Sequence, residues 1–325
     1  MSYRKLAFAL IAMLSLTAMA FPAPFAPGER VAFLGDSITR QAWYLGYLQL
    51  HANLTVKGDA VKLVNVGVSG DTATGALERY DWDIKPVRAD RFFVMFGMND
   101  VKVTLYDGKA PDVARKAERE RALATYATNL RVLIDRLRAD GRKVVLMTPT
   151  PYDEYARTNG GTLFKDANEQ GLSRCAEIVR RLAAEEQIPC IDLYRPLTQL
   201  WKTAPEPGYT RDRVHPTETG ARLVAAEILK SMGVTEPSLP TNGTAYATTM
   251  QLCQAEGQRR ILPQVRMDIT RRGGNPDDRA SFEATIKAWR MELESRTNCS
   301  EKDRRHYLDY FTGIWDYYRK ETFHD

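Results

Sequence analysis

The fold of this chain is decided by the stretch VAFLGDSI at residues 31–38, in which a short apolar run ends in small and polar residues. Continuous runs of this kind, rich in β-branched and aromatic residues, are typical of strands buried on both faces of a parallel sheet. Four further runs of similar length follow at residues 63–66, 92–96, 144–147 and 188–193. The sequence therefore predicts five parallel strands.

Helical patterns lie between these runs. Apolar residues recur at i, i+3, i+4 and i+7 in residues 123–137 and again in residues 172–183. Gly141 and Gly233 stand where the end of a helix favours a left-handed residue. Because strand and helix alternate from residue 30 to residue 233, we expect an α/β fold, namely a three-layer α/β/α sandwich with right-handed crossovers.

Four short segments carry the polar residues of interest. They read GDSI (35–38), NVGVSGD (65–71), GMND (97–100) and DRVHP (212–216). The first three lie at the carboxyl ends of predicted strands, which is where open α/β sheets bind their ligands. We therefore expect these segments to meet in one site.

Ser37 is the candidate nucleophile. Its hydroxyl follows the first strand and stands at the start of a helical pattern, where free backbone N–H groups favour developing negative charge. The alternative is that Ser37 only caps this helix, as serine often does. Residue 39 is threonine, so the Gly-x-Ser-x-Gly nucleophile elbow of other hydrolases is absent.

His215 is the candidate base among the four histidines of the chain. It precedes Pro216, a residue favoured in the first turn of a helix. Asp212, three residues earlier, can accept a hydrogen bond from one ring nitrogen and leave the other facing Ser37. Such a contact fixes the tautomer and stabilises the imidazolium. The alternative is a surface aspartate and a helix-capping histidine.

Two further positions can supply hydrogen-bond donors to an oxyanion. Asn99 offers a side-chain amide at the end of the third strand, and Gly70 offers a backbone N–H that no side chain shields. Gly67 is a rival for the glycine role, but we interpret it as a turn residue. Turn chemistry is also the alternative for Gly70 and Asn99.

Asp36 and Asp100 are interpreted as supporting groups that hold these loops by hydrogen bonds to the backbone. Together with Asp212 and His215, they form an alternative hypothesis of a site for a hard cation. No His-x-His or paired-carboxylate spacing supports that hypothesis. We therefore expect neither a metal nor another cofactor.

Taken in order, the four segments resemble the blocks of the SGNH (GDSL-type) serine hydrolase family over about residues 30–233, with Ile38 in place of the usual leucine. The resemblance implies a flavodoxin-like form of the predicted sandwich. It also implies transfer of an acyl group to water without a metal or cofactor. Members of the family are esterases, lipases, thioesterases and carbohydrate deacetylases, so the acyl group and the alcohol stay open.

The resemblance also implies roles for individual residues. Ser37, His215 and Asp212 correspond to the catalytic triad of the family. The backbone N–H of Ser37, together with Gly70 and Asn99, corresponds to its oxyanion hole.

The N-terminus indicates export. Arg4 and Lys5 precede an apolar stretch at residues 6–20 that ends in Ala-Met-Ala, which is typical of a signal peptide. The stretch is shorter than the roughly 20 residues of a membrane span. We expect a cleaved leader at residues 1–20, a Pro-rich tether at 21–29, no membrane span after cleavage, and a secreted or periplasmic protein. An uncleaved N-terminal anchor is the alternative.

The charge of the chain argues against nucleic acid as a partner. Loss of the leader removes Arg4, Lys5 and no acidic residue, which lowers the formal net charge from +5 to +3. No stretch concentrates Lys and Arg with aromatic residues as a nucleic-acid groove would.

The four cysteines suit an oxidising compartment, and none lies within a few residues of another, as metal ligands often do. Two disulfides are conceivable, Cys175 with Cys190 and Cys253 with Cys299. A buried thiol is the alternative for Cys175, which lies on the apolar face of its helical pattern.

We expect the hydrolase domain at residues 30–236 and a helical extension at 237–325. The extension carries several aromatic residues that would either bind carbohydrate or pack on the main domain, the latter being favoured by their helical spacing. They are Trp289, Tyr307, Tyr310, Phe311, Trp315, Tyr317 and Tyr318.

The loops over the strand ends indicate the substrate. Residues 101–117 are highly charged, residues 149–165 carry Tyr152, Tyr155, Asn159 and Phe164, and residues 201–211 contain Trp201 and Tyr209. Aromatic faces beside polar groups favour a sugar, and no long apolar stretch would build a lipid groove. We expect a small-molecule or polysaccharide ester with a short acyl group, most simply acetyl.

Two alternatives stay open at this point. One is a lipase or thioesterase of the same fold that acts on longer acyl chains. The other is a non-catalytic glycan-binding protein on the same scaffold.

Overall fold

The computed structural model describes residues 24–109, 111–156, 163–204 and 208–295. The expected signal peptide, Asn159, Cys299 and the aromatic residues from Tyr307 onward lie outside these ranges. Of the expected tether, residues 24–29 are described, and Phe25 is buried against the domain. The guanidinium of Arg91 lies 5.9 Å from the centre of the Phe25 ring.

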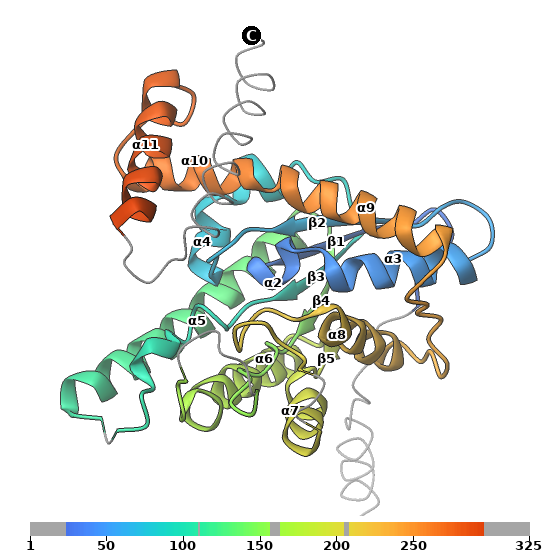
Figure 1. Cartoon of the computed structure of the whole chain (residues 1–325), viewed down its shortest axis with the longest axis horizontal. Coiled ribbons are helices and arrows are strands. Elements are labelled where there is room, and N and C mark those ends of the chain that lie inside the picture. Colours follow the sequence, from blue (N-terminus) through green and yellow to red (C-terminus); the bar gives the residue numbers. More distant parts are fainter. Residues whose placement is uncertain (1–23, 110, 157–162, 205–207, 296–325) are drawn as a thin grey trace, which may run out of the picture.

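The chain folds around one five-stranded parallel sheet in the order β2-β1-β3-β4-β5 (Figure 1). The strands are β1 (Arg30–Gly35), β2 (Lys62–Gly67), β3 (Arg91–Met95), β4 (Lys143–Met147) and β5 (Cys190–Ile191). The longer helices are α3 (Trp43–Thr55), α5 (Val113–Ala139), α6 (Ser173–Glu185), α7 (Tyr194–Thr203), α8 (Glu218–Ser231), α9 (Thr244–Arg259), α10 (Ile261–Arg271) and α11 (Arg279–Ser295). Short helical segments are α2 (Ser37–Arg40), α4 (Ala73–Glu78), η1 (Tyr80–Ile84), η2 (Val103–Leu105) and η3 (Ala167–Leu172).

The helices form two layers. Helices α3 and α8 pack against each other, whereas α5 packs against α4 and α6. The five predicted strands and the α/β/α sandwich are therefore confirmed. Gly141 and Gly233 have positive φ angles of 75° and 82°, as the positions of helix ends require.

The register of strands β2, β1 and β3 places their carboxyl ends side by side. Gly35 at the end of β1 pairs with Gly67 of β2 on one side and with Met95 of β3 on the other. Beneath these ends Phe33 stacks on Phe93, with ring centroids 4.8 Å apart, in the buried core. The loops that follow β1, β2 and β3 therefore start from a rigid, closely packed edge.

Strand β5 is shorter than the predicted run at residues 188–193. At its start, the N–H of Ile188 donates to the carbonyl of Ala183 and so belongs to the turn that ends α6. At its end, the hydroxyl oxygen of Thr148 accepts from the N–H groups of Leu193 and Tyr194, at 2.8 and 2.9 Å. Because of these contacts, the strand ends at Ile191 and α7 begins at Tyr194. The apolar character of residues 188–193 alone predicts a longer strand.

Helix α5 begins earlier than its apolar pattern indicated. Asp112 caps the helix by accepting from the N–H of Arg115 at 2.8 Å. The last residues of the charged segment 101–117, expected as a loop, are therefore the first turn of α5. Val101 at the other end of this segment is fully buried.

The extension expected from residue 237 onward is helical where the structure describes it. Helix α9 packs along α3 and reaches β2, and α10 and α11 continue from it (Figure 1). Met250 of α9 is buried against Gly46 of α3, and the rings of Tyr246 and Tyr47 lie 6.0 Å apart. In the described part of the chain, no helix combines the length and hydropathy of a bilayer span.

The conceivable disulfide between Cys175 and Cys190 does not form, and the three described cysteines, Cys175, Cys190 and Cys253, are free thiols. Cys175 is completely buried on α6, so the alternative of a buried thiol applies to it. Burial raises the pKa of Cys190 to about 12 and that of Cys253 to about 11, which leaves both thiols protonated at neutral pH.

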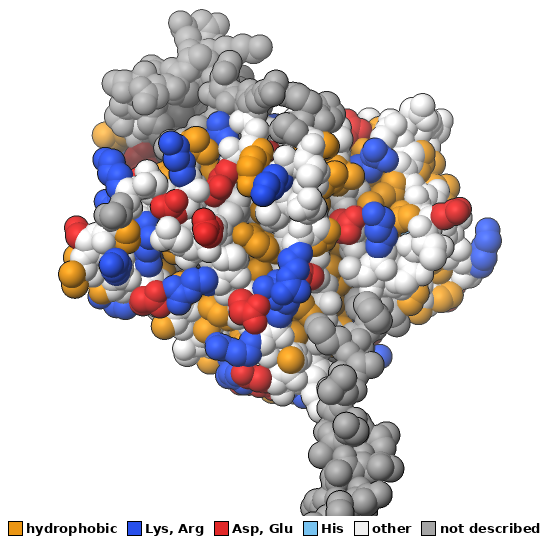
Figure 2. Space-filling view, turned by 90° about the horizontal axis from the view of Figure 1, so that it is seen from below, with side chains coloured by type: hydrophobic (Ala, Val, Ile, Leu, Met, Phe, Trp, Pro, Cys, Tyr) orange, Lys and Arg blue, Asp and Glu red, His pale blue; other side chains and the backbone are white. Residues whose placement is uncertain are grey.

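Basic and acidic side chains are mixed on the face of the molecule that carries the lower helices of Figure 1. Figure 2 shows this face, on which Lys and Arg lie beside Asp and Glu over the described residues. This face therefore presents no continuous basic surface.

Candidate active site

Ser37 is the first residue of α2, and Asp36 alone separates it from the end of β1. The cap of this helix is Asp36, whose Oδ1 accepts from the N–H of Ile38 at 2.9 Å. Ser37 is therefore not the capping residue, and its hydroxyl is available for another partner. That partner is His215, whose Nε2 accepts from the Ser37 hydroxyl at 2.8 Å.

His215 is oriented by Asp212, as the spacing of the two residues predicted. His215 Nδ1 donates to Asp212 Oδ2 at 2.6 Å, and the backbone N–H of His215 donates to Asp212 Oδ1 at 2.8 Å. Although partial burial opposes ionisation, these hydrogen bonds from His215 lower the pKa of Asp212 to about 2. Asp212 is thus a carboxylate at neutral pH, and it fixes the His215 tautomer that can accept a proton from Ser37.

A contact that the sequence did not reveal clamps the loop of Asp212 and His215. Arg213 between them has a left-handed backbone, with φ of 73°, which is uncommon for a residue with a side chain. Its carbonyl accepts from the N–H of Asp153 at 2.8 Å, and its guanidinium donates to the carbonyl of Asp153 at 3.1 Å. The buried Asp153 carboxylate also accepts from the Thr210 hydroxyl at 2.9 Å. These bonds hold the strained loop in place.

The two glycines proposed for the oxyanion hole differ clearly. Gly67 ends β2, where a Cβ would collide with the backbone nitrogen of Arg40, and its own N–H already donates to Asn65 Oδ1 at 2.9 Å. Gly67 is therefore required for close packing, and its interpretation as a turn residue is wrong. Gly70 is exposed, with φ of 71°, and no atom lies within 4 Å of the position of a Cβ.

Asn99 faces the same region from the loop after β3. Its Nδ2 donates to the carbonyl of Asp71 at 2.9 Å and lies 3.5 Å from Asp36 Oδ2. Asp71 directly follows Gly70, so Asn99 is bonded to the loop that carries that glycine. The structure thus brings Ser37, Gly70 and Asn99 together at the carboxyl ends of three adjacent strands.

Asp36 and Asp100 both hold backbone groups of these loops. Asp100 accepts from the N–H of Ala73 at 2.9 Å and from the N–H of Gly97 at 3.0 Å, which joins the loops after β2 and β3. Burial raises the pKa of Asp36 and the pKa of Asp100 to about 7 each. Over the described ranges, no three His, Cys, Asp or Glu side chains converge as a metal site requires.

Beneath the Gly70 loop lies a buried ion pair that sequence reasoning missed. The Asp71 carboxylate accepts from Arg79 Nε at 2.9 Å, and both side chains are completely buried. Arg79 also pairs with Asp83, four residues later. In the sequence this i, i+4 pair is typical of an exposed helix surface, so no signal indicated its burial.

A pocket of about 470 Å³ adjoins Asn99. Lys102 and Glu118 on its wall form an ion pair at 3.2 Å. Its polar lining consists of Thr72, Thr74, Asn99, Asp100, Lys102, Glu118, Arg121, Thr125 and Tyr126. Thr72 also caps α4, so this wall is continuous with the loop of Gly70.

Most of the aromatic residues expected to contact substrate are instead part of the core. Trp201, Tyr209 and Tyr152 are only 1%, 6% and 2% exposed. Trp201 stacks on Tyr209, with ring centroids 6.5 Å apart. Phe164 packs on Tyr152, with ring centroids 5.9 Å apart, whereas Tyr155 is exposed. The expected contact of Trp201, Tyr209 and Tyr152 with a sugar is therefore wrong, because a packed aromatic and a binding aromatic look the same in a sequence.

The profile of the GDSL-like Lipase/Acylhydrolase family matches residues 33–223, more than half of the chain. An acetylxylan esterase of Geobacillus stearothermophilus is 24% identical over 221 residues, which cover 63% of this chain and 94% of that protein.

Solved structures are similar as well. One, of a gut microbial diltiazem-metabolizing enzyme, is 28% identical with a TM-score of 0.56, and the match covers 66% of this chain and 49% of that one. Another, of an acetylxylan esterase from Geobacillus stearothermophilus, is 23% identical with a TM-score of 0.50, covers 65% of this chain and 96% of that one, and shows the fold alone. The chain is therefore a carboxylic ester hydrolase of the GDSL-like lipase/acylhydrolase family.

Proposed function

We propose that this protein removes short acyl groups, chiefly acetyl, from a carbohydrate by serine catalysis. The observation that carries the proposal is the 2.8 Å contact between the Ser37 hydroxyl and His215 Nε2, with Asp212 bonded to the far side of the ring. In the reaction, Ser37 Oγ attacks the ester carbonyl while His215 takes the hydroxyl proton. His215 then returns this proton to the leaving alcohol, and water hydrolyses the acyl-enzyme by the same steps.

The negative charge that develops on the carbonyl oxygen is received by the N–H groups of Ser37 and Gly70 and by the amide of Asn99. The Asn99 nitrogen carries two hydrogens, and one of them is bonded to the Asp71 carbonyl. This bond orients the amide. The second hydrogen faces Asp36 Oδ2 at the longer Nδ2–Oδ2 distance of 3.5 Å, and the oxyanion would replace this weak partner. A donor fixed before the reaction avoids the free-energy cost of reorganisation in the transition state.

Two observations support a carbohydrate as the alcohol. The pocket beside Asn99 is lined by threonines and charged side chains, which match sugar hydroxyls better than a long acyl chain. The acetylxylan esterase of Geobacillus stearothermophilus is similar to this chain over 94% of the length of that esterase. The signal-peptide pattern at residues 1–20 supports action outside the cytoplasm. N-terminal sequencing of the mature protein tests whether this leader is cleaved.

Acetate release from acetylated xylooligosaccharides, compared with Ser37→Ala, tests the proposal. We expect Ser37→Ala to lower kcat by about 10⁶-fold, as loss of a serine nucleophile does in other hydrolases. Equal rates for the two proteins would leave a glycan-binding role on an inactive scaffold. With p-nitrophenyl esters we expect the rate to fall from acetyl to longer acyl groups, and a rise would indicate a lipase or thioesterase instead.

A further inference from the structure

A line of buried charges runs from the oxyanion side of the site to the C-terminal extension. Asp71 pairs with Arg79, Arg79 pairs with Asp83, and Asp83 pairs with Arg260. Arg260 lies between α9 and α10 and binds Asp83 with both terminal nitrogens, at 2.7 and 2.6 Å. The side chains of Asp83 and Arg260 are only 8% and 12% exposed, so these bonds form almost without solvent.

Both arginines also bind the backbone at the end of β2. Arg79 donates to the carbonyl of Val66 at 2.9 Å, and Arg260 Nε donates to the carbonyl of Gly67 at 3.3 Å. The chain continues from there to Gly70 and Asp71. The extension therefore holds the start of the oxyanion loop directly and its end through the ion pairs.

The line contains two carboxyl groups and two guanidiniums. Burial raises the pKa of Asp71, and the bonds from Arg79 oppose this shift. Although burial opposes ionisation, the guanidiniums of Arg260 and Arg79 hold the pKa of Asp83 below its usual range. Without Arg260, Asp71 and Asp83 would both depend on their ion pairs with Arg79. Arg79 would then be drawn toward Asp83 and away from Asp71, because an uncompensated buried charge is strongly unfavourable.

We propose that Arg260 is a positioning residue for the oxyanion hole, which acts through Asp83, Arg79 and Asp71 on Asn99. The last step is the bond from Asn99 to the Asp71 carbonyl, because a shift of Asp71 changes the direction of that amide. The inference rests on the role proposed above for Asn99. It gives the extension a part in catalysis, although Arg260 lies outside the segment that matches the family, residues 33–223.

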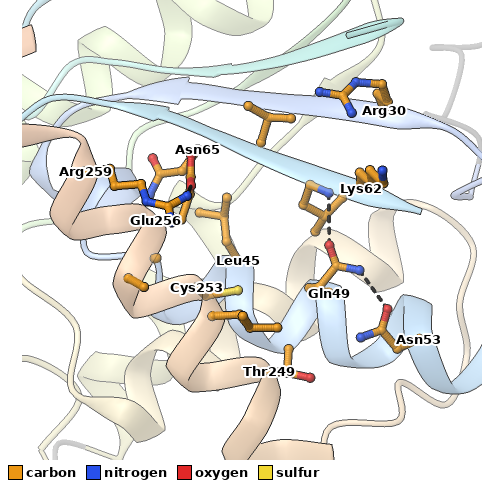
Figure 3. Close-up of a pocket in the computed structure, with 15 residues that line it drawn as sticks. Arg30, Leu45, Gln49, Asn53, Lys62, Asn65, Thr249, Cys253, Glu256 and Arg259 are labelled. Atoms are coloured by element: carbon orange, nitrogen blue, oxygen red, sulfur yellow. Dashed lines mark hydrogen bonds and ion pairs between the residues drawn. The ribbon is translucent and has the colours of Figure 1, made fainter. Parts of the chain in front are cut away.

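Arg260→Met tests this role, with Arg259→Met as the matched control. Arg259 is the neighbouring residue, but its guanidinium lies beside Glu256 at 3.5 Å, on the wall of a cavity of about 530 Å³ between α9, α3 and β2 (Figure 3). We expect Arg260→Met to lower kcat about fivefold, the size of effect seen for residues that couple to a site from a distance. KM should be nearly unchanged, Arg260→Lys should recover part of the loss, and Arg259→Met should match wild type.

A double-mutant cycle with Asn99→Ala separates positioning from general stability. If Arg260 acts through Asn99, Arg260→Met has almost no further effect on kcat in the Asn99→Ala protein. An equal loss in both backgrounds, or a lower Tm with unchanged kcat, would overturn the inference. Should Arg260→Met fail to fold, Arg260→Lys enters the same cycle. Activity that survives Ser37→Ala would instead refute the proposed function, so the two failures are distinguishable.

Discussion

The two sides of the candidate active site are held in different ways. On the nucleophile side, Asp212 and His215 are neighbours in the sequence and partly exposed, at 41% and 24% of their side-chain surface. On the oxyanion side, Asn99 depends on Asp71 and Arg79, whose side chains are completely buried and paired.

Because of this difference, we expect substitutions on the nucleophile side to affect mainly activity and substitutions beneath the oxyanion loop to affect the stability of the fold as well. A change in the triad loop removes a reacting group but leaves few buried partners behind. A change beneath the oxyanion loop leaves a buried charge without its partner, which affects the fold as well as the rate.

Asp212→Asn gives the largest expected effect. An asparagine of the same shape favours the wrong tautomer of His215, so we expect kcat to fall by about 10⁴-fold, as in other serine hydrolases. The lowered pKa of Asp212 means that its ionised form also stabilises the folded chain near pH 7, so we expect a Tm decrease, smaller than that of Arg79→Met because Asp212 is 41% exposed. A loss of less than about tenfold would remove Asp212 from the triad.

Arg79→Met is expected to act mainly on stability. It leaves Asp71 and Asp83 buried with one guanidinium fewer, so the free energy of unfolding should drop by about 3–5 kcal/mol. The control is Arg174→Met, which removes a half-exposed ion pair with Glu120 and should change stability by less than about 1 kcal/mol. Equal effects in urea unfolding would contradict the contrast drawn here.

Asn99→Ala should lower kcat by about 10²–10³-fold, the range found when one oxyanion donor is removed. KM should change little, because the bond strengthens mainly in the transition state. Steady-state kinetics with p-nitrophenyl acetate separates the two parameters. An effect confined to KM would place Asn99 in substrate binding rather than in the oxyanion hole.

Asp36 lies where the two sides meet, since it caps the helix of Ser37 and faces Asn99. Its pKa of about 7 in the folded chain is above the unfolded value of 3.8, so the folded state holds the proton more tightly. This contribution to stability is complete below pH 3.8 and is lost as the pH rises through 7. Asp36→Asn does not titrate, so it should gain stability relative to wild type between pH 5 and 7, by up to about 1.4 kcal/mol per pH unit. Parallel Tm curves for the two proteins would show that Asp36 is ionised throughout.

The sequence predicts the nucleophile side well because its residues lie in short segments beside an apolar strand or at the start of a helix. Ser37 follows a buried strand, and the Asp212-to-His215 spacing is a local feature. The positions of Asn99 and Gly70 in the same site could also be predicted, since adjacent parallel strands bring their carboxyl ends together.

The supporting contacts could not be predicted for a physical reason. Arg79 and Asp83 have the spacing of a surface pair, and Arg260 approaches them from far along the chain. The aromatic rings of Trp201 and Tyr209 predict contact with a sugar, yet the two rings stack on each other and are buried. Tertiary contacts decide whether these side chains are buried and which partners they have, and local sequence patterns do not contain that information.

Covalent trapping is the most direct test of the central claim that Ser37, activated by His215, attacks the ester. The purified protein is treated with a fluorophosphonate, digested and mapped by mass spectrometry, with His215→Ala in parallel. We expect one adduct per chain, located on Ser37, and almost none in the variant. An adduct on another residue, or full hydrolytic activity after Ser37 has been modified, would contradict the account.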